Sequence, residues 1–172
     1  MVVDGTSFQV LLHTQVFDDC NDAAAKLSGK EIAVAHIFYK FGATPDPTNR
    51  QLRVLSAQVD IDKSYVEMPD ISWPNMSPAE VGDTQAMSAE LAFHERGHLK
   101  IAVTSAAEVT AERHTLVVGA DTRIALAALY ENLNERQLAY DKLTAHGVHQ
   151  SRAPEGLRGD DVHLTCRAKK TQ

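Results

Sequence analysis

Residues 78–102 read PAEVGDTQAMSAELAFHERGHLKIA, and this stretch decides the fold. Alanine, glutamate and leucine dominate it, and no proline occurs from Ala79 to Val117. Gly82 and Gly97 are its only interior glycines. Because such a composition is typical of helices, the sequence predicts one long helix, or two short helices in line, from Ala79 to about Val117.

The centre of this predicted helix carries a metal-binding pattern, His94-Glu95-Arg96-Gly97-His98. Histidines at positions i and i+4 lie one turn apart on the same helix face, so both imidazoles can bind one zinc ion. Glu95 lies next to them, where it can take a proton from a water that zinc activates. We therefore expect His94 and His98 to be zinc ligands and Glu95 to be the catalytic base.

A catalytic zinc needs a third protein ligand. Glycine at 101 and histidine at 104 would indicate the metzincin class, but this chain has Ile101 and Thr104. The third ligand is then expected from a second helix, Thr122 to Ala145, with Asp121 as its N-cap and Gly147 just past its end.

The return of this second helix predicts which residue reaches the zinc. If it runs antiparallel after a turn near residue 120, residue 142 is level with His98 and residue 146 with His94. His146 is therefore the predicted third ligand. Glu135 or Glu131 remains the alternative, in a thermolysin-like arrangement, although both lie further from the motif.

The N-terminal half is richer in strand-forming residues. Glu31 to Phe41 is β-branched and aromatic, and Leu52 to Asp62 alternates apolar with polar residues, so both are predicted strands. Tyr65 to Met68 is expected to form a short edge strand stopped by Pro69, where an extended peptide could add. Thr6 to Val16 is expected to form a helix, with a strand as the alternative.

Bulk properties narrow the class of protein. The net charge of −6 and the pI of about 5.7 argue against a nucleic-acid binder. No apolar run approaches the ~18 residues needed to span a bilayer. Cys20 and Cys166 are too far apart for a CxxC motif. One disulfide between them, or two free thiols, are equally compatible with the sequence.

Several stretches carry a family resemblance. They are Val3-Asp4-Gly5-Thr6, the Met68-Pro69 and Trp73 region, the motif with the following Leu99-Lys100-Ile101-Ala102, and Tyr140-Asp141-Lys142-Leu143-Thr144-Ala145-His146-Gly147. Together they resemble a family of bacterial secreted proteins, domain of unknown function 922, described as zinc-dependent proteases. The last stretch resembles a Tyr-Asp-x-x-Thr-x-His-Gly signature of that family, which supports His146 as a ligand. Tyr140 and Asp141 are expected next to the ligands, in supporting positions.

The resemblance also implies a location and a domain organisation. It implies a secreted or periplasmic protein, although the first residues show neither the basic start nor the apolar core of a signal peptide. Residues 1–150 are expected to form a metallopeptidase domain, and residues 151–172 a polar C-terminal tail.

The expected fold is α+β and zincin-like. A small, mostly antiparallel sheet packs on the long motif helix, which a second, antiparallel helix follows. The expected activity is hydrolysis of a peptide or protein substrate with zinc (Zn2+) as cofactor, and neither nucleic acid nor membrane is an expected partner. The alternatives are a zinc-stabilised binding module that cleaves nothing and a metallopeptidase toxin or effector domain. The sequence leaves the substrate preference and the oligomeric state open.

Overall fold

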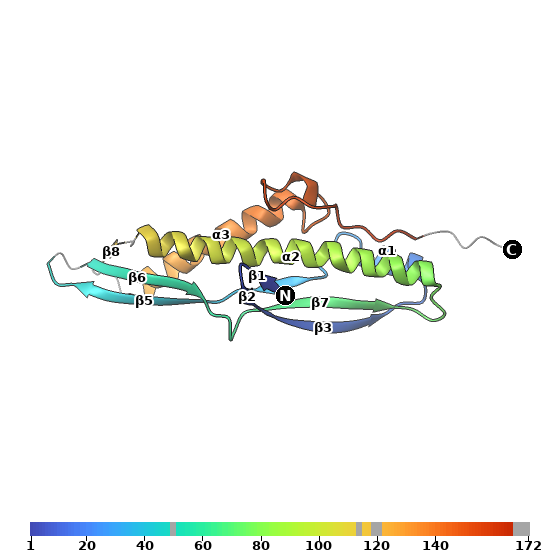
Figure 1. Ribbon diagram of the computed structural model, residues 1–172, viewed down its shortest axis with the longest axis horizontal. Coiled ribbons are helices and arrows are strands. Elements are labelled where there is room, and N and C mark those ends of the chain that lie inside the picture. The colour runs from blue at the N-terminus through green and yellow to red at the C-terminus, as the bar shows by residue number, and fades with distance from the viewer. Residues whose placement is uncertain (49–50, 113–114, 118–121, 167–172) are drawn as a thin grey trace.

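The computed structural model describes the 172 residues except 49–50, 113–114, 118–121 and 167–172. In chain order the elements are β1 (Val2–Val3), β2 (Thr6–Ser7), β3 (Gln9–Val16), α1 (Cys20–Leu27), β4 (Val34–His36), β5 (Tyr39–Asp46), β6 (Gln51–Val59), β7 (Tyr65–Ser72), α2 (Pro78–Glu112), β8 (Thr115–Val117), α3 (Thr122–Thr144) and η1 (Gln150–Arg152). Helix α2 runs along most of the molecule, with the strands along one side and α3 along another (Figure 1).

The predicted α+β class is confirmed. Among the described residues every strand pairing is antiparallel except that of β3 with β7. Small sheets pack on one long helix, and a second helix packs on it in the antiparallel direction. No helix among the described residues is long and apolar enough to cross a membrane.

A reciprocal cap starts α2. The Ser77 N–H donates to Glu80 Oε2 (2.7 Å), and the Glu80 N–H donates to Ser77 Oγ (3.3 Å). Pro78 is the first helical residue, where its missing N–H leaves no partner unpaired. With 35 residues α2 is continuous, about 52 Å long. It ends at Glu112, earlier than predicted, because Thr115–Val117 pairs with β6 as β8.

Tyr65 to Met68 was predicted to be an edge strand that stops at Pro69, and both its position and its end are wrong. The strand continues through Pro69 to Ser72, and β7 is the central strand of a sheet with the order β3-β7-β4. Thr6 to Val16 forms β2 and β3, so the predicted helix there is also wrong. The cause is the same, since β3 and β7 pair in parallel over their whole length, and a local sequence pattern does not show such distant pairing.

The third sheet, with the order β5-β6-β8, contains a bulge. The predicted strand Leu52 to Asp62 is confirmed as β6, but the register shifts between Gly42 and Ala43, and Leu55 has no partner in β5. A bulge turns the following side chains to the other face. Val54 and Ala57 are therefore buried, whereas Leu55, an apolar residue of the alternating pattern, is 51% exposed.

The other predicted strand, Glu31 to Phe41, is divided between β4 and β5, which belong to different sheets. The predicted second helix is confirmed as α3. Its predicted N-cap, Asp121, lies outside the described residues.

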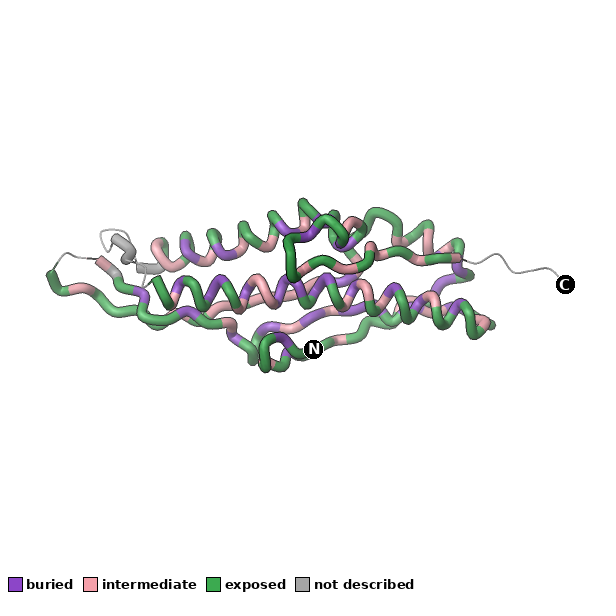
Figure 2. Tube along the Cα trace, turned by 45° about the horizontal axis from the view of Figure 1, so that its top comes forward, coloured by how far each residue is buried: buried purple, intermediate pink, exposed green. Residues whose placement is uncertain are grey.

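Two apolar clusters hold the layers together. The larger joins the first part of α2 to α1 and the β3-β7-β4 sheet, and includes Trp73 and Leu91. The smaller joins the last part of α2 to β6 and α3, and includes Val54 and Leu133. Figure 2 shows buried positions along the whole of α2. Because the motif lies in the middle of α2, the packing of both clusters against this helix fixes its position.

The segment after α3 folds back along α2. We call residues 154–166 the C-terminal strap. The Val162 N–H donates to the Gly147 carbonyl (3.0 Å), and the strap ends at a disulfide between Cys166 and Cys20, the first residue of α1. The Cα atoms of the two cysteines are 5.7 Å apart. Of the two alternatives that the sequence left open, the structure has the disulfide.

Candidate metal centre

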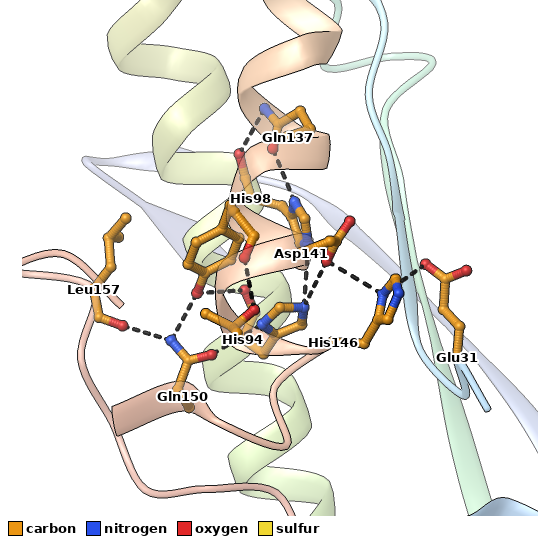
Figure 3. Close-up of polar contacts among 10 residues, drawn as sticks. Glu31, His94, His98, Gln137, Asp141, His146, Gln150 and Leu157 are labelled. Carbon is orange, nitrogen blue, oxygen red and sulfur yellow. Dashed lines mark hydrogen bonds and ion pairs between the residues drawn. The ribbon is translucent and has the colours of Figure 1, made fainter. Parts of the chain in front are cut away.

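His94 and His98 lie on adjacent turns of α2, with their Nε2 atoms 3.2 Å apart. Both are buried, with 1% and 7% of their surfaces exposed. Asp141 of α3 lies opposite them, as Figure 3 shows, and its Oδ1 is 3.2 Å from His94 Nε2 and 2.9 Å from His98 Nε2. These three donor atoms form a group that could hold a metal ion.

Two glutamines fix the protonation of the histidine rings. His94 Nδ1 lies 2.9 Å from Gln150 Oε1, and His98 Nδ1 lies 2.8 Å from Gln137 Oε1. The Gln150 Nε2 donates to Tyr140 Oη (2.7 Å) and to the Leu157 carbonyl (2.5 Å), so its Oε1 must face His94.

Gln137 is oriented in the same way, because its Nε2 donates to the His98 carbonyl (3.3 Å). An amide oxygen can only accept, so each imidazole carries a proton on Nδ1, and in its neutral form it turns an Nε2 lone pair toward Asp141. Outer partners of this kind are typical of histidines that bind metals.

The result is a cluster of acceptors that needs a cation. In the neutral tautomers, His94 Nε2, His98 Nε2 and the Asp141 carboxylate converge with no proton among them. Either imidazolium protons or a metal ion can neutralise this arrangement. Zinc bonds of 2.0–2.1 Å in a tetrahedron put ligand atoms about 3.3 Å apart, close to the three observed separations. The residues therefore fit a bound zinc ion.

Without metal, the attraction between the histidines and Asp141 shifts their pKa values. Partial burial alone would raise the pKa of Asp141, but hydrogen bonds from His94 and His98 hold it well below its usual range. Burial alone would lower the pKa of His98, but the Asp141 hydrogen bond and the nearby charges of Glu95 and Asp141 raise it.

Glu95 is buried beside the two histidines, with 2% of its surface exposed. Its Oε2 has no hydrogen-bond partner among the described residues. Burial raises the pKa of Glu95, against the opposing charges of His98 and His94. A carboxyl group in this environment holds a proton more readily than an exposed one, which suits a group that takes up and returns protons.

Gly97, inside the motif, makes room for an aromatic wall. A Cβ at Gly97 would lie 2.7 Å from Cζ of Tyr140 and closer still to its Oη. The Tyr140 ring stacks on His94 with centroids 5.0 Å apart and meets His98 edge-on at 4.9 Å. Burial raises the pKa of Tyr140 to about 12, so the phenol stays neutral. Tyr140 therefore packs against both motif histidines, and its supporting role at a metal site stays a prediction.

His146 lies on the exposed side of the centre. Its Nδ1 is 3.3 Å from Asp141 Oδ1 and 3.6 Å from Glu31 Oε1 (Figure 3). These three residues form a second possible metal group, which shares Asp141 with the first. His146 therefore lies next to the motif, while Asp141 makes the direct contacts with both motif histidines. The prediction of His146 as the third ligand stays a prediction.

A left-handed turn presents His146. Ala145, His146 and Gly147 have φ values of 48°, 53° and 88°. This conformation suits glycine but costs other residues about 1–2 kcal/mol each. Gly147 is also packed closely, since a Cβ there would lie 3.3 Å from His94 Cβ and 2.8 Å from Val162 Cγ2.

The alternative ligands do not reach the centre. Glu131 and Glu135 belong to neither of the two possible metal groups found in the described part of the chain. Sequence reasoning missed Gln137 and Gln150, because glutamine seldom binds metals and gives no motif. The one signal was spacing, since Gln137 lies one turn before Asp141 on the same face of α3.

The fold and this group define the class: an α+β domain that carries a potential His-His-Asp metal centre between its central helix α2 and the antiparallel helix α3. The chain belongs to a family described as bacterial protein of unknown function (DUF922), which matches residues 13–147. The match covers the motif, Asp141 and His146, and confirms the resemblance found in the sequence. No curated protein and no solved structure matches the chain.

Proposed function

We propose that this chain is a zinc-dependent metallopeptidase. One observation carries the proposal: His94 Nε2, His98 Nε2 and Asp141 Oδ1 converge at separations that suit zinc ligands. Glu95 supports the catalytic half of the proposal, since a site that only stabilises a fold needs no buried carboxyl group beside the metal.

The chain's residues then have distinct roles. Zinc at this centre would polarise the peptide carbonyl and make a water more acidic. Glu95 takes the proton from that water and returns it to the leaving amine. Its raised pKa helps the second transfer, because the protonated form persists closer to neutral pH. Gln137 and Gln150 hold the imidazole rings in the tautomer that the metal requires.

The third ligand is proposed to be Asp141, because its Oδ1 lies closest to both Nε2 atoms. His146 is the competing assignment from the sequence signature. Asp141→Asn and His146→Ala, each titrated with zinc against a chelating dye, decide between them. The true ligand is the one whose loss lowers the zinc affinity by orders of magnitude.

An extracellular or periplasmic location fits this proposal. Disulfides persist in oxidising compartments and are rare in the cytosol. The Cys20–Cys166 disulfide and membership of a bacterial family are compatible with export. The substrate would then be a peptide or protein outside the cytoplasm.

A second candidate is a zinc-stabilised module without catalysis. The low exposure of His94, Glu95 and His98 favours it, because a structural metal is normally closed off from solvent. Access to the centre in this chain is from the side of His146, whose side chain is 47% exposed.

The decisive experiment compares Glu95→Gln with the wild-type chain. We expect about one zinc per chain in both by elemental analysis and equal thermal stability, with loss of peptide cleavage only in the variant. The matched control is Glu135→Gln on the exposed face of α3, which should cleave normally.

Two outcomes would contradict the proposal. Absence of zinc from protein purified without added metal, with no thermal stabilisation on adding zinc, would remove the metal centre. Bound zinc with no cleavage by wild-type protein would favour the structural module.

A further inference from the structure

A cavity of about 520 Å³ lies beside the metal centre. It is lined by α1, the following loop, the first half of α2, the turn after α3 and the C-terminal strap. Six of its lining residues carry the argument: Ala24, Met87, Leu91, His146, Val162 and Leu164.

The floor of the cavity is apolar and its rim is polar. Met87 and Leu91 are each 2% exposed and belong to the larger apolar cluster. Ser28, Lys30 and His163 are exposed. An apolar pocket with a few polar groups at its mouth is the usual form of a site for an apolar ligand group.

The cavity adjoins the proposed catalytic centre through His146. His146 lines it, and His146 Nδ1 is 3.3 Å from the Asp141 oxygen that contacts both motif histidines. Leu91 lies one helical turn before Glu95, on the same face of α2. A chain bound at the metal therefore has this cavity within reach of its neighbouring side chain.

The strap gives the cavity a fixed wall. Val162 is tied to Gly147 by a backbone hydrogen bond, and Leu164 lies two residues before Cys166 of the disulfide. Both apolar side chains also pack against the larger cluster. A wall held at both ends keeps the cavity formed without a ligand, which lowers the ordering cost of binding.

We propose that this cavity holds a large apolar side chain, such as leucine or phenylalanine, of the substrate residue next to the scissile bond. The proposal rests on the proposed peptidase function, and it gives that function a substrate class. It assigns specificity to α1 and the strap, and chemistry to α2 and α3.

The test fills the cavity from α1. Ala24 lines the wall and is partly exposed, so Ala24→Trp places an indole in the cavity without disturbing the buried floor. Ala25→Trp is the matched control, since Ala25 is the next residue, is exposed and does not line the cavity. Zinc content and thermal denaturation check that both variants keep metal and fold.

Two readouts separate the pocket from the reaction. The first is kcat/KM for peptide pairs that differ only by leucine or alanine next to the cleaved bond. The second needs no turnover: calorimetry of leucine hydroxamate and alanine hydroxamate, whose hydroxamate chelates the metal while the side chain probes the cavity. Burying the larger side chain should favour leucine by roughly 10- to 100-fold in both readouts.

We expect the wild-type chain and Ala25→Trp to show this preference for leucine. In Ala24→Trp we expect leucine and alanine to bind almost equally. Equal affinity for the two hydroxamates in wild-type protein, or a preference that survives in Ala24→Trp, would overturn the assignment. Leucine selectivity of the hydroxamates without any peptide cleavage would keep the pocket and refute the peptidase function. Cleavage without apolar preference would keep the peptidase function and refute the pocket.

Discussion

Replacing either glutamine behind the histidines with leucine tests the tautomer argument. Gln137→Leu and Gln150→Leu each remove the acceptor that holds a proton on Nδ1. Loss of such a partner typically weakens metal binding 10- to 100-fold, or about 1.4–2.7 kcal/mol. We therefore expect the zinc dissociation constant of each variant to rise by that factor.

The two variants should differ in stability. Gln150 is 0% exposed and makes three hydrogen bonds, to His94, Tyr140 and Leu157. At about 1 kcal/mol for each bond, Gln150→Leu should lower the free energy of unfolding by about 3 kcal/mol. Gln137 is only partly buried and makes two such bonds, so Gln137→Leu should cost about 1–2 kcal/mol.

Zinc titration against a competing dye and urea denaturation of the metal-free protein measure the two quantities separately. Gln85→Leu, at an exposed position on α2, is the matched control and should change neither. Wild-type zinc affinity in both glutamine variants, with stability lowered as calculated, would refute the reasoning. It would mean that the glutamines stabilise the fold through their hydrogen bonds but do not prepare the Nε2 atoms to bind metal.

Other perturbations have defined outcomes. Gly97→Ala should cost about 1–3 kcal/mol in urea denaturation and lower the zinc content, because the added methyl group displaces the Tyr140 ring. Cys166→Ser opens a bridge across 146 residues, and should lower the free energy of unfolding by about 2–4 kcal/mol; reductant should do the same to wild-type protein and nothing further to the variant. In metal-free protein, the raised pKa of His98 stabilises the fold below about pH 6.5, and this stabilisation is lost as pH rises through the pKa of the folded state. The lowered pKa of Asp141 stabilises the fold above about pH 4, and this stabilisation is lost in stronger acid. Thermal denaturation should therefore show metal-free stability falling as pH rises above about 6.5, where the stabilisation by added zinc should grow, since zinc requires neutral histidine.

The helix that carries the motif was predictable because its signals are local. The composition of residues 79–112, the spacing of His94 and His98 and the proline at 78 all act within a few turns. The strand order was not predictable from the sequence, because β3 and β7 pair in parallel and lie far apart along the chain. Pro69 was expected to stop a strand that long-range pairing continues.

The candidate site was predictable only as far as the helix register allows. Predicting an antiparallel return placed residue 142 level with His98, and the structure brings the adjacent Asp141 to both motif histidines. A difference of one position changes which side chain faces the two motif histidines, because successive residues on a helix point about 100° apart. Gln150 could not be predicted, since it lies in the short 3-10 helix η1 after the turn that ends α3, and the register of α2 and α3 does not place it.

The disulfide turns most of the chain into a covalent ring. A single backbone cut anywhere between Cys20 and Cys166 opens this ring but leaves its two pieces joined. For a peptidase this matters, because self-cleaved molecules would migrate as intact protein until they are reduced. A nick in a loop far from α2 would also leave His94, His98 and Asp141 in one molecule, so nicked protein would keep the residues of the potential metal centre together.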